Sequence, residues 1–487
     1  MVGKVADWVR EEFSTLEVGD SRLNERVGVY VTQAMSFGDS NPDRCQSNSQ
    51  LKGYYRMVGN AKMTHSQLFE SHNEATITRC GEQELVYLAQ DTTVVDLTNP
   101  HTVVEGAGPL NAGPQRGFFF HPSYAIAESG VPLGLVDQQI IIRDEASLKL
   151  SSDQRQANRR QACFEEKESA RWLEILQSNE QLARSLPNTQ FVSVADSEAD
   201  ISELFCECTD FPANHRLIIR SSNQRNIRWA TDVSNGQSLA QGGLLEDALR
   251  LAQTRFEREV SVGFRPAPKF PDDKKRKRKQ ARSARDTTLE VSTLRVKLAG
   301  PKRPGDNLAD CTLNIVQLIE PAPPQGEPPI HWVLYTDLPV QSQEQVEAVI
   351  KGYCMRWKIE LLFKTLKSGL KIEKMRFKTI SRYLNAVALL VPVAWRVEYL
   401  KEAARVDPHS PCSKYFNQTQ WTAIMIFKNQ AAVDPTQPPT TADFLKTVAQ
   451  IGGYINKKSQ GPPGSQTIWR GMARFDTIVQ AFQIFNK

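Results

Sequence analysis

Residues 85–91, LVYLAQD, form a nearly continuous apolar run that ends in an acid. Residues 191–196, FVSVAD, repeat this pattern, and a third apolar run covers residues 215–221. Short runs of this kind are typical of buried strands, and the helices expected between them favour parallel pairing. Asp91 and Asp196 would meet at the carboxyl edge of the sheet if their two strands are neighbours.

A hairpin is predicted next to the first of these strands. The apolar segments 116–127 and 131–142 flank Glu128-Ser-Gly130, which is a turn signal. Apolar spacing predicts one helix over residues 165–185 and another that begins at Ser197. Because a hairpin adds antiparallel strands, the expected fold class is α/β with a mixed sheet and flanking helices.

Residues 225 to about 340 interrupt the alternation of strands and helices. Four apolar segments predict a β-rich insertion there, over residues 259–264, 288–298, 311–318 and 331–337. Between them the strongly basic run from Lys274 to Arg282 is followed by Arg285. We expect a flexible loop that contacts the DNA backbone, and a solvated tract without a partner is the alternative.

The two ends of the chain are predicted to be helical. Residues 1–70 form a small module that carries Arg22 and Arg26, and such a module could bind DNA. A helical bundle with ordinary surface charges is the alternative. From residue 381 onward the chain begins with a long apolar helix that contains Pro392, and further helices follow.

Composition restricts the protein class only broadly. The 487 residues are 40% hydrophobic and 24% charged, as is ordinary for soluble globular proteins. A net charge of +5 does not by itself indicate a nucleic-acid partner. No apolar run is long enough for a membrane span, and the start lacks the apolar core of a signal peptide. Eight scattered Cys without a CxxC pair favour reduced thiols in a cytosolic protein over a zinc site.

The stretch from 352 to 369 is GYCMRWKIELLFKTLKSG. It places four polar side chains at helical spacing: Tyr353, Arg356, Glu360 and Lys367. If residues 342–368 are one α-helix, these side chains share about 60° of one face. A carboxylate between two cations suits a divalent metal beside a phosphate, and an exposed helix with spaced ion pairs is the alternative.

Three acids are therefore the candidate metal ligands: Asp91, Asp196 and Glu360. Two divalent ions held by such carboxylates can activate a water or a 3′-hydroxyl and stabilise the leaving oxygen of a phosphodiester. The alternative is that the two aspartates only cap strands or turns. Nearby acids, namely Asp96, Glu198 and Asp200, are weaker candidates because of their positions past the strand ends.

Several motifs add to the Tyr353/Arg356/Glu360/Lys367 spacing. They are Gln90-Asp-Thr-Thr93, Ala195-Asp-Ser-Glu-Ala-Asp-Ile201, and Trp332, which lies 21 residues before Tyr353. With these motifs the chain resembles the bacterial DDE transposases of the insertion-sequence-four group over nearly its whole length. Leu23 and Leu361 depart from the family pattern.

This resemblance implies a ribonuclease H-like core interrupted by a β-rich insertion. It assigns DNA binding to residues 1–70, catalysis to residues 71–380 with the insertion at about 225–340, and dimerisation to residues 381–487. Asp91, Asp196 and Glu360 would bind two Mg²⁺ or Mn²⁺ ions. The terminal helix is expected to be short, since the chain stops soon after Gln483, and this would affect dimer geometry more than chemistry.

The resemblance also implies a set of DNA contacts. Tyr353, Arg356 and Lys367 would contact phosphates near the cleaved end, and Trp332 would stack on a flipped base. The other expected DNA contacts are Arg22, Arg26, Arg220 and Lys364.

The implied reaction is nicking, hairpin formation and opening at transposon ends, and then strand transfer into target DNA. Its partners are terminal-repeat DNA, target DNA and a second copy of the chain, in the cytoplasm at the nucleoid and without a membrane. Two alternatives are a stand-alone metal-dependent DNA nuclease and an inert DNA-binding inhibitor of transposition. A nuclease would not need the N-terminal module or Trp332, and the presence of all three acids argues against an inert protein.

Overall fold

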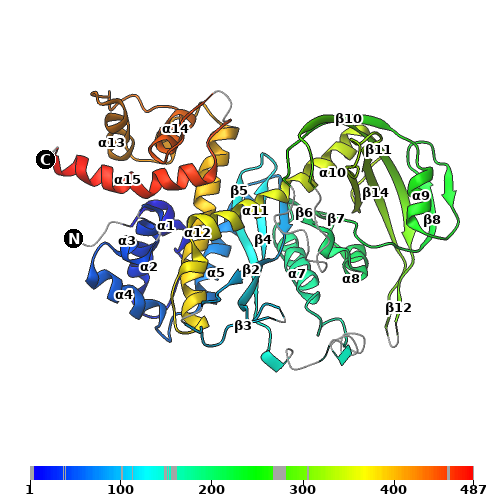
Figure 1. The fold of residues 1–487 in the computed structure, drawn as a ribbon, viewed down its shortest axis with the longest axis horizontal. Coiled ribbons are helices and arrows are strands. Elements are labelled where there is room, and N and C mark those ends of the chain that lie inside the picture. Colours follow the sequence, from blue (N-terminus) through cyan, green and yellow to red (C-terminus); the bar gives the residue numbers. More distant parts are fainter. Residues whose placement is uncertain are drawn as a thin grey trace. The chain divides into compact units, whose positions relative to one another are not determined.

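The structure is a computed structural model that describes residues 5–36, 38, 40–99, 102–111, 113–146, 151, 153–154, 162–266, 281–303, 306–457 and 461–485. The chain divides into two compact units, whose elements are drawn in Figure 1. The first unit comprises Met1–Arg171, Ser185–Thr189 and Trp357–Lys487, and the second comprises Trp172–Arg184 and Gln190–Arg356. The first unit is thus built mainly from the two ends of the chain, and the second from its middle.

Helices fill the N-terminal part of the first unit. They are α1 (Asp7–Glu12), α2 (Ser21–Ser36), α3 (Asn41–Cys45), α4 (Asn48–Val58) and α5 (His65–Gly81). Asp20 precedes α2 and caps it, because its carboxylate accepts a hydrogen bond from the backbone N–H of Arg22 at 3.0 Å. Ser40 caps the short helix α3 by accepting the N–H of Asp43.

The strands of the first unit pair around one long strand. They are β1 (Leu85–Gln90), β2 (Thr93–Asp96), β3 (Gly108–Pro109), β4 (Arg116–Ala127) and β5 (Pro132–Ile141). Strands β1, β2, β3 and β5 all pair antiparallel with β4. The predicted hairpin is confirmed as β4–β5, and Gly130 takes a φ of 90° in its turn, which is accessible to glycine without a steric penalty.

The C-terminal part of the first unit is helical, as predicted. Its elements are α11 (Trp357–Lys364), the π-helical turn η4 (Thr365–Gly369), η5 (Ile372–Lys374), α12 (Ile380–Val406), η6 (Cys412–Lys414), α13 (Gln418–Asn429), α14 (Thr441–Ile451) and α15 (Ser465–Phe485). The predicted apolar core helix is α12, which contains Pro392 and packs against α2, α5, β5 and α15. In Figure 1 the red helix α15 begins beside α12.

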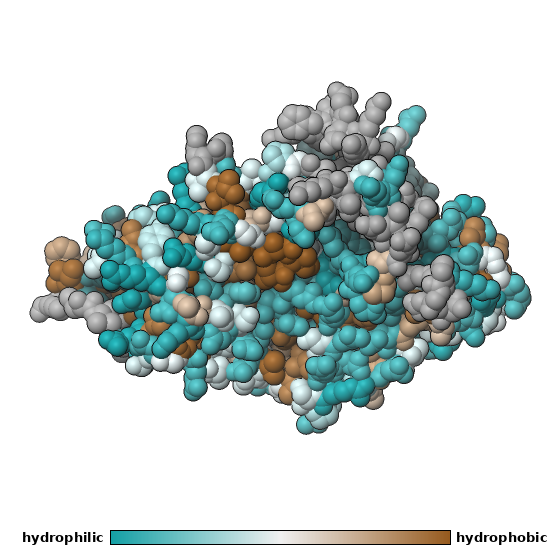
Figure 2. Space-filling model, turned by 90° about the horizontal axis from the view of Figure 1, so that it is seen from below, coloured by the Kyte–Doolittle hydropathy of each residue, from teal (hydrophilic) through white to brown (hydrophobic). Residues whose placement is uncertain are grey.

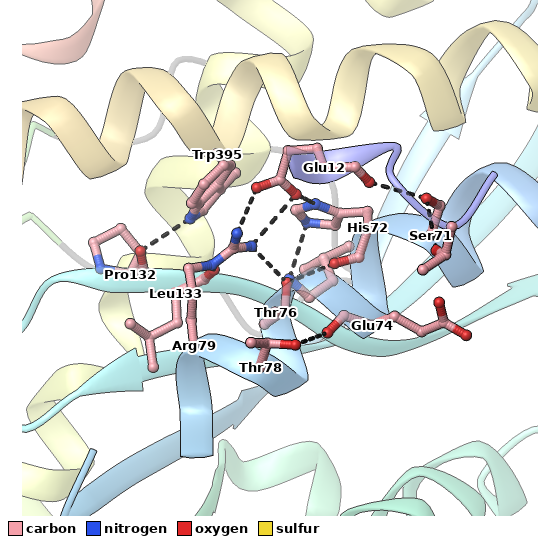
Figure 3. Close-up of polar contacts among 12 residues, drawn as sticks. Glu12, Ser71, His72, Glu74, Thr76, Thr78, Arg79, Pro132, Leu133 and Trp395 are labelled. Atoms are coloured by element: carbon pink, nitrogen blue, oxygen red, sulfur yellow. Dashed lines mark hydrogen bonds and ion pairs between the residues drawn. The ribbon is translucent and has the colours of Figure 1, made fainter. Parts of the chain in front are cut away.

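A buried polar network joins α1 and α5 to β5 and α12 (Figure 3). Glu12 accepts hydrogen bonds from Nδ1 of His72 at 2.6 Å and Nη1 of Arg79 at 2.5 Å. Nε2 of His72 receives the backbone N–H of Leu135 at 3.2 Å, and the guanidinium of Arg79 lies 4.2 Å from the ring centre of Trp395. Burial alone would raise the pKa of Glu12, but His72 and Arg79 outweigh it, and the pKa is lowered.

The sheet of the second unit is mixed, as predicted. Its strands are β6 (Gln190–Ala195), β7 (His215–Arg220), β8 (Ile227–Asp232), β9 (Ser238–Ala240), β10 (Phe256–Val262), β11 (Arg285–Leu298), β14 (Cys311–Ile319) and β15 (His331–Thr336). Their order is β6-β7-β15-β14-β11-β8-β9, and β10 pairs with β11. Strands β6 and β7 run parallel and the others pair antiparallel. The strands predicted between residues 259 and 337 are therefore confirmed, although β8 and β9 were not predicted.

The remaining elements of this part of the chain are the two-stranded ribbon β12 (Lys302–Arg303) with β13 (Asp306–Asn307), and the helices α7 (Ala170–Ser185), η2 (Ser197–Ala199), α8 (Ser202–Glu207), η3 (Cys208–Asp210), α9 (Leu245–Leu251) and α10 (Gln343–Met355). Trp172 of α7 and Phe205 of α8 pack into one apolar core with the sheet. The prediction of an α-helix from Ser197 is wrong. Asp196 accepts the N–H of Glu198 and caps a single 3₁₀ turn, so the α-helix begins only at Ser202.

The prediction of one α-helix over residues 342–368 is also wrong. Helix α10 ends at Met355, α11 begins at Trp357, and residues Thr365–Gly369 form a π-helical turn. In that turn the N–H of Leu370 bonds to the carbonyl of Thr365 at 2.8 Å. A π-helical turn contains more residues than an α-helical turn, so Lys367 does not keep the angular position that an unbroken α-helix would give it.

The predicted basic loop is described only in part, since residues 274–280 lie outside the described residues. The backbone of Arg282 pairs with that of Arg265, and Arg285 begins β11. The guanidinium of Arg285 bonds to Glu320 at 2.8 Å and to Glu327 at 2.7 Å, so its charge is already matched within the fold.

Among the described residues, no helix combines the length and the apolar character that crossing a membrane requires. The face of the molecule drawn in Figure 2 is mostly hydrophilic and carries separate apolar patches.

Candidate nucleic-acid and metal site

In the second unit, Asp196 and Arg220 end two neighbouring parallel strands. The register of β6 and β7 pairs Ala195 with Ile219, so Asp196 follows the end of β6 at the level where β7 reaches Arg220. Both side chains are half-buried. The prediction that Asp196 closes a buried strand is confirmed, and the sheet places a cation beside that acid.

Two aromatic rings lie next to this pair. Trp332 of β15 and Tyr353 of α10 make an edge-to-face contact with 5.1 Å between ring centroids. The guanidinium of Arg220 lies 5.8 Å from the ring centre of Trp332, and that of Arg356 lies 6.0 Å from the ring centre of Tyr353. Burial raises the pKa of Tyr353, and the charge of Asp196 acts in the same direction, whereas the two arginines act against it.

The second unit therefore gathers one predicted metal ligand and four predicted DNA contacts. They are Asp196, Arg220, Trp332, Tyr353 and Arg356. They come from four separate segments of the chain, namely the ends of β6 and β7, strand β15 and the end of α10. Two guanidinium groups beside a partly exposed indole can hold phosphates and stack on a base.

In the first unit, Asp91 follows the last residue of β1. Its Oδ1 accepts the N–H of Thr92 at 2.7 Å. The Thr92 hydroxyl bonds to Nδ1 of the buried His121 at 2.9 Å and accepts Nε of Arg171 at 3.1 Å. Burial and the nearby Arg171 lower the pKa of His121 to about 3, so its ring is neutral at physiological pH. Sequence reasoning missed His121 and Arg171, because neither lies in a motif and only β4 and α7 bring them to Thr92.

Glu360 lies on α11, which packs against β1, the strand that precedes Asp91. Its side chain is half-buried. Lys367, in the turn after α11, donates to the carbonyl of Val94 on β2 and lies 3.4 Å from Glu373. Glu373 in turn accepts the N–H of Asp96 at 3.2 Å. Lys367 thus anchors the helical segment of Glu360 to the chain that follows Asp91.

The other predicted DNA contacts of the first unit lie at its surface. Lys364 is exposed on α11. On α2, the side chain of Arg22 is 89% exposed and 3.5 Å from Asp20, and the exposed Arg26 donates to the carbonyl of Gly53 at 3.4 Å. All three cations are placed where a phosphate could reach them.

The donor set of the three acids suits a hard divalent cation. Asp91 and Glu360 belong to the first unit and Asp196 to the second. Each carboxylate is half-buried and offers the oxygen ligands that Mg²⁺ or Mn²⁺ prefers. In the described part of the chain, no three His, Cys, Asp or Glu side chains are grouped closely enough to hold a metal ion.

Comparison with known proteins places two family models at the ends of the chain. Residues 5–63 match the model described as transposase DNA-binding, and residues 392–484 match the model described as transposase Tn5 dimerisation domain. Among solved structures, the cryo-EM structure of a piggyBac transposase synaptic complex with hairpin DNA is 8% identical. That match covers 83% of this chain and 73% of the other, with a TM-score of 0.33.

Proposed function

We propose that the chain is a Tn5-like transposase of the insertion-sequence-four group that moves DNA by a cut-and-paste reaction with a hairpin intermediate. In this reaction it nicks DNA at the transposon ends, and the freed 3′-hydroxyl closes a hairpin on the opposite strand. Water then opens the hairpin, and the regenerated 3′-hydroxyl attacks target DNA. Every step is a substitution at one phosphodiester, so a single active site can serve them all.

The observation that carries the proposal is the cluster of Arg220, Trp332, Tyr353 and Arg356 around Asp196. Hydrolysis of DNA would require only the metal-binding carboxylate of this cluster. A hairpin also requires a sharply bent strand with an unstacked base, and Trp332 provides a surface on which that base can stack. The two arginines provide donors for the phosphates on either side of the bend.

We infer that Asp91, Asp196 and Glu360 together hold Mg²⁺ or Mn²⁺ when DNA is bound. Two ions bound there would favour deprotonation of the attacking water or hydroxyl and stabilise the leaving oxygen. The chain orients these carboxylates through its own contacts. Thr92 fixes Asp91, the Glu198 amide fixes Asp196, and Lys367 links the segment of Glu360 to β2.

The proposal includes a ribonuclease H-like core. It is supported by the antiparallel set of β1, β4 and β5 in the first unit and by the parallel pair β6 and β7 in the second. An acid directly follows β1 and another follows β6.

The proposed partners are terminal-repeat DNA, target DNA and a second copy of the chain, all in the bacterial cytoplasm. The matched DNA-binding model at residues 5–63 contains Arg22 and Arg26, and the matched dimerisation model covers α13, α14 and α15.

The test is incubation of the protein with Mg²⁺ and a duplex that carries the inverted repeats flanking its own gene. We expect a nick, then a hairpin on the transposon end, then joined product when target DNA is added. Glu360→Ala serves as the inactive control. Nicking without a hairpin would instead indicate a stand-alone nuclease, and binding without any cleavage would indicate an inhibitor of transposition.

A further inference from the structure

A cavity of about 430 Å³ lies within the first unit, beside the helical segment that carries Glu360. Its walls come from α11 and η4, from α12, and from the start of α15. Lys364, Lys401 and Arg405 line it, and among the described residues no acidic side chain does. The cavity therefore presents positive charge without a lining carboxylate.

Two of these cations are held in place by carboxylates behind the wall. The side chain of Lys401 is only 4% exposed, and it pairs with Glu398 and with Glu402. Its Nζ also donates to Oγ of Ser465 at 2.9 Å, and Arg405 bonds to Glu402 at 2.9 Å. The three lining cations outnumber these two carboxylates, so positive charge remains for a ligand.

A buried donor without a partner belongs to a residue that lines the same space. Trp469 is 2% exposed, and its indole N–H has no hydrogen-bond partner among the described residues. A Cβ added at Gly369 would lie 3.6 Å from Cδ1 of this indole, the carbon bonded to the N–H nitrogen. Both residues line the cavity. An acceptor there would satisfy a buried group that native proteins rarely leave unpaired.

The first turn of α15 adds further donors. This 21-residue helix begins at Ser465, and Gln466 and Thr467 of its first turn line the cavity. The first amides of a helix and the positive end of its dipole favour an anion. Donors therefore reach the cavity from α11, α12 and α15.

We propose that this cavity binds a phosphate group of a DNA strand, and this inference rests on the proposed function. A phosphate has several acceptor oxygens and no donor, which matches a wall made of cations, hydroxyls and N–H groups. A strand of DNA is favoured over free phosphate by the placement of Lys364. This exposed cation follows Glu360 by one helical turn, so a strand that reaches Glu360 passes the mouth of the cavity. The cavity would thereby link DNA binding near Glu360 to the helices of the matched dimerisation model.

Two conservative variants test this site without removing a charge. Trp469→Phe keeps an aromatic ring, although a smaller one, and deletes the N–H. Gly369→Ala places a methyl group against the indole edge at an ordinary contact distance, so the fold should tolerate it. We expect each variant to bind a short duplex about tenfold more weakly than the wild type. Ethylation of one backbone phosphate should weaken binding by the wild type but not binding by either variant.

The matched controls are Trp395→Phe, whose indole N–H already donates to Pro132 at 2.9 Å, and Lys428→Gln on the exposed side of α13. Unchanged far-UV circular dichroism of both test variants would exclude misfolding.

Inorganic phosphate, used as a second probe, separates the possible sources of the ligand. If it raises the melting temperature of the wild type but not of Gly369→Ala, while DNA affinity is the same in both, the cavity binds free phosphate and the DNA assignment is overturned. If neither probe distinguishes the variants from their controls, no anion site exists there. These measurements need binding only, so a failure to cleave transposon ends would overturn the proposed function and leave the result for the cavity standing.

Discussion

The indole of Trp332 meets the phenol of Tyr353 edge to face, with ring centroids 5.1 Å apart and planes inclined by 72°. Tyr353 is 5% exposed, whereas Trp332 keeps more of its surface accessible. The buried phenol therefore supports an indole that can receive a base on its remaining surface. This arrangement separates a supporting residue from a stacking residue and leads to the first prediction.

Replacing Trp332 with alanine should spare the first nick and impair hairpin formation, because only the hairpin needs a flipped base. Since stacking of a base on an aromatic ring contributes about 1–3 kcal/mol, we expect a loss of hairpin of roughly tenfold or more. Denaturing gels of end-labelled duplex measure both steps in one reaction. Trp332→Phe, which keeps an aromatic surface at the same position, is the matched control. Equal loss of both steps in Trp332→Ala would argue against stacking.

Glu360→Ala should abolish nicking of end-containing DNA and leave DNA binding largely intact, because it removes a proposed metal ligand and no DNA-contacting cation. Gel shift and cleavage on the same duplex separate the two effects. Glu84→Ala removes an exposed acid just before β1 and should be active. Wild-type cleavage by Glu360→Ala would eliminate the proposed mechanism.

Arg22→Ala and Arg26→Ala should each weaken binding to the terminal repeats. If each arginine contacts one phosphate, the slope of log affinity against log salt concentration should fall in magnitude by about 0.9 per variant. Arg10→Ala, on the exposed surface of α1, should change neither quantity. An unchanged gel-shift affinity for both α2 variants would place end recognition elsewhere in the chain.

Glu12→Gln should lower the free energy of unfolding by about 3–5 kcal/mol, because it removes one partner of a buried ionic network. The pKa of Glu12 is lowered in the folded state, so the unfolded chain binds more protons over the range between the two pKa values. This contribution is present above the unfolded pKa and is lost as the pH falls through the folded pKa. Urea unfolding between about pH 3 and pH 7 should show a weaker acid dependence in the variant. Identical pH dependence in both proteins would contradict this assignment.

The local elements were predictable because they depend on neighbouring residues. Segments such as Leu85–Gln90 and Gln190–Ala195 are short apolar runs, and Gly130 marks a turn, so their strands and hairpin follow from periodicity and turn chemistry. The continuous helix over residues 342–368 failed for a non-local reason. Thr365 donates its hydroxyl to the buried Glu398 at 2.5 Å, a partner from α12 beside the π-helical turn that helical periodicity does not reveal.

The candidate site, too, could be predicted from the sequence only in part. Its acids and the Tyr353/Arg356 spacing are visible in the chain, whereas the support of Asp91 by Thr92, His121 and Arg171 is not. That support depends on a strand and a helix far away in sequence. The basic tract gives a converse example, because Arg285 resembles part of a DNA-binding run but is neutralised by Glu320 and Glu327. The predicted domain boundaries at residues 70 and 380 stay predictions.

By itself, the sequence determined many of the strands and helices and which residues could carry the chemistry, since periodicity and motif spacing are local properties. Only the tertiary structure decided that Arg220, Trp332 and Tyr353 gather beside Asp196, and that Trp469 borders a cavity lined by cations. The physical reason is that such neighbours depend on strand order and helix packing. Burial of apolar surface across the whole chain selects both, and no short stretch of residues encodes them.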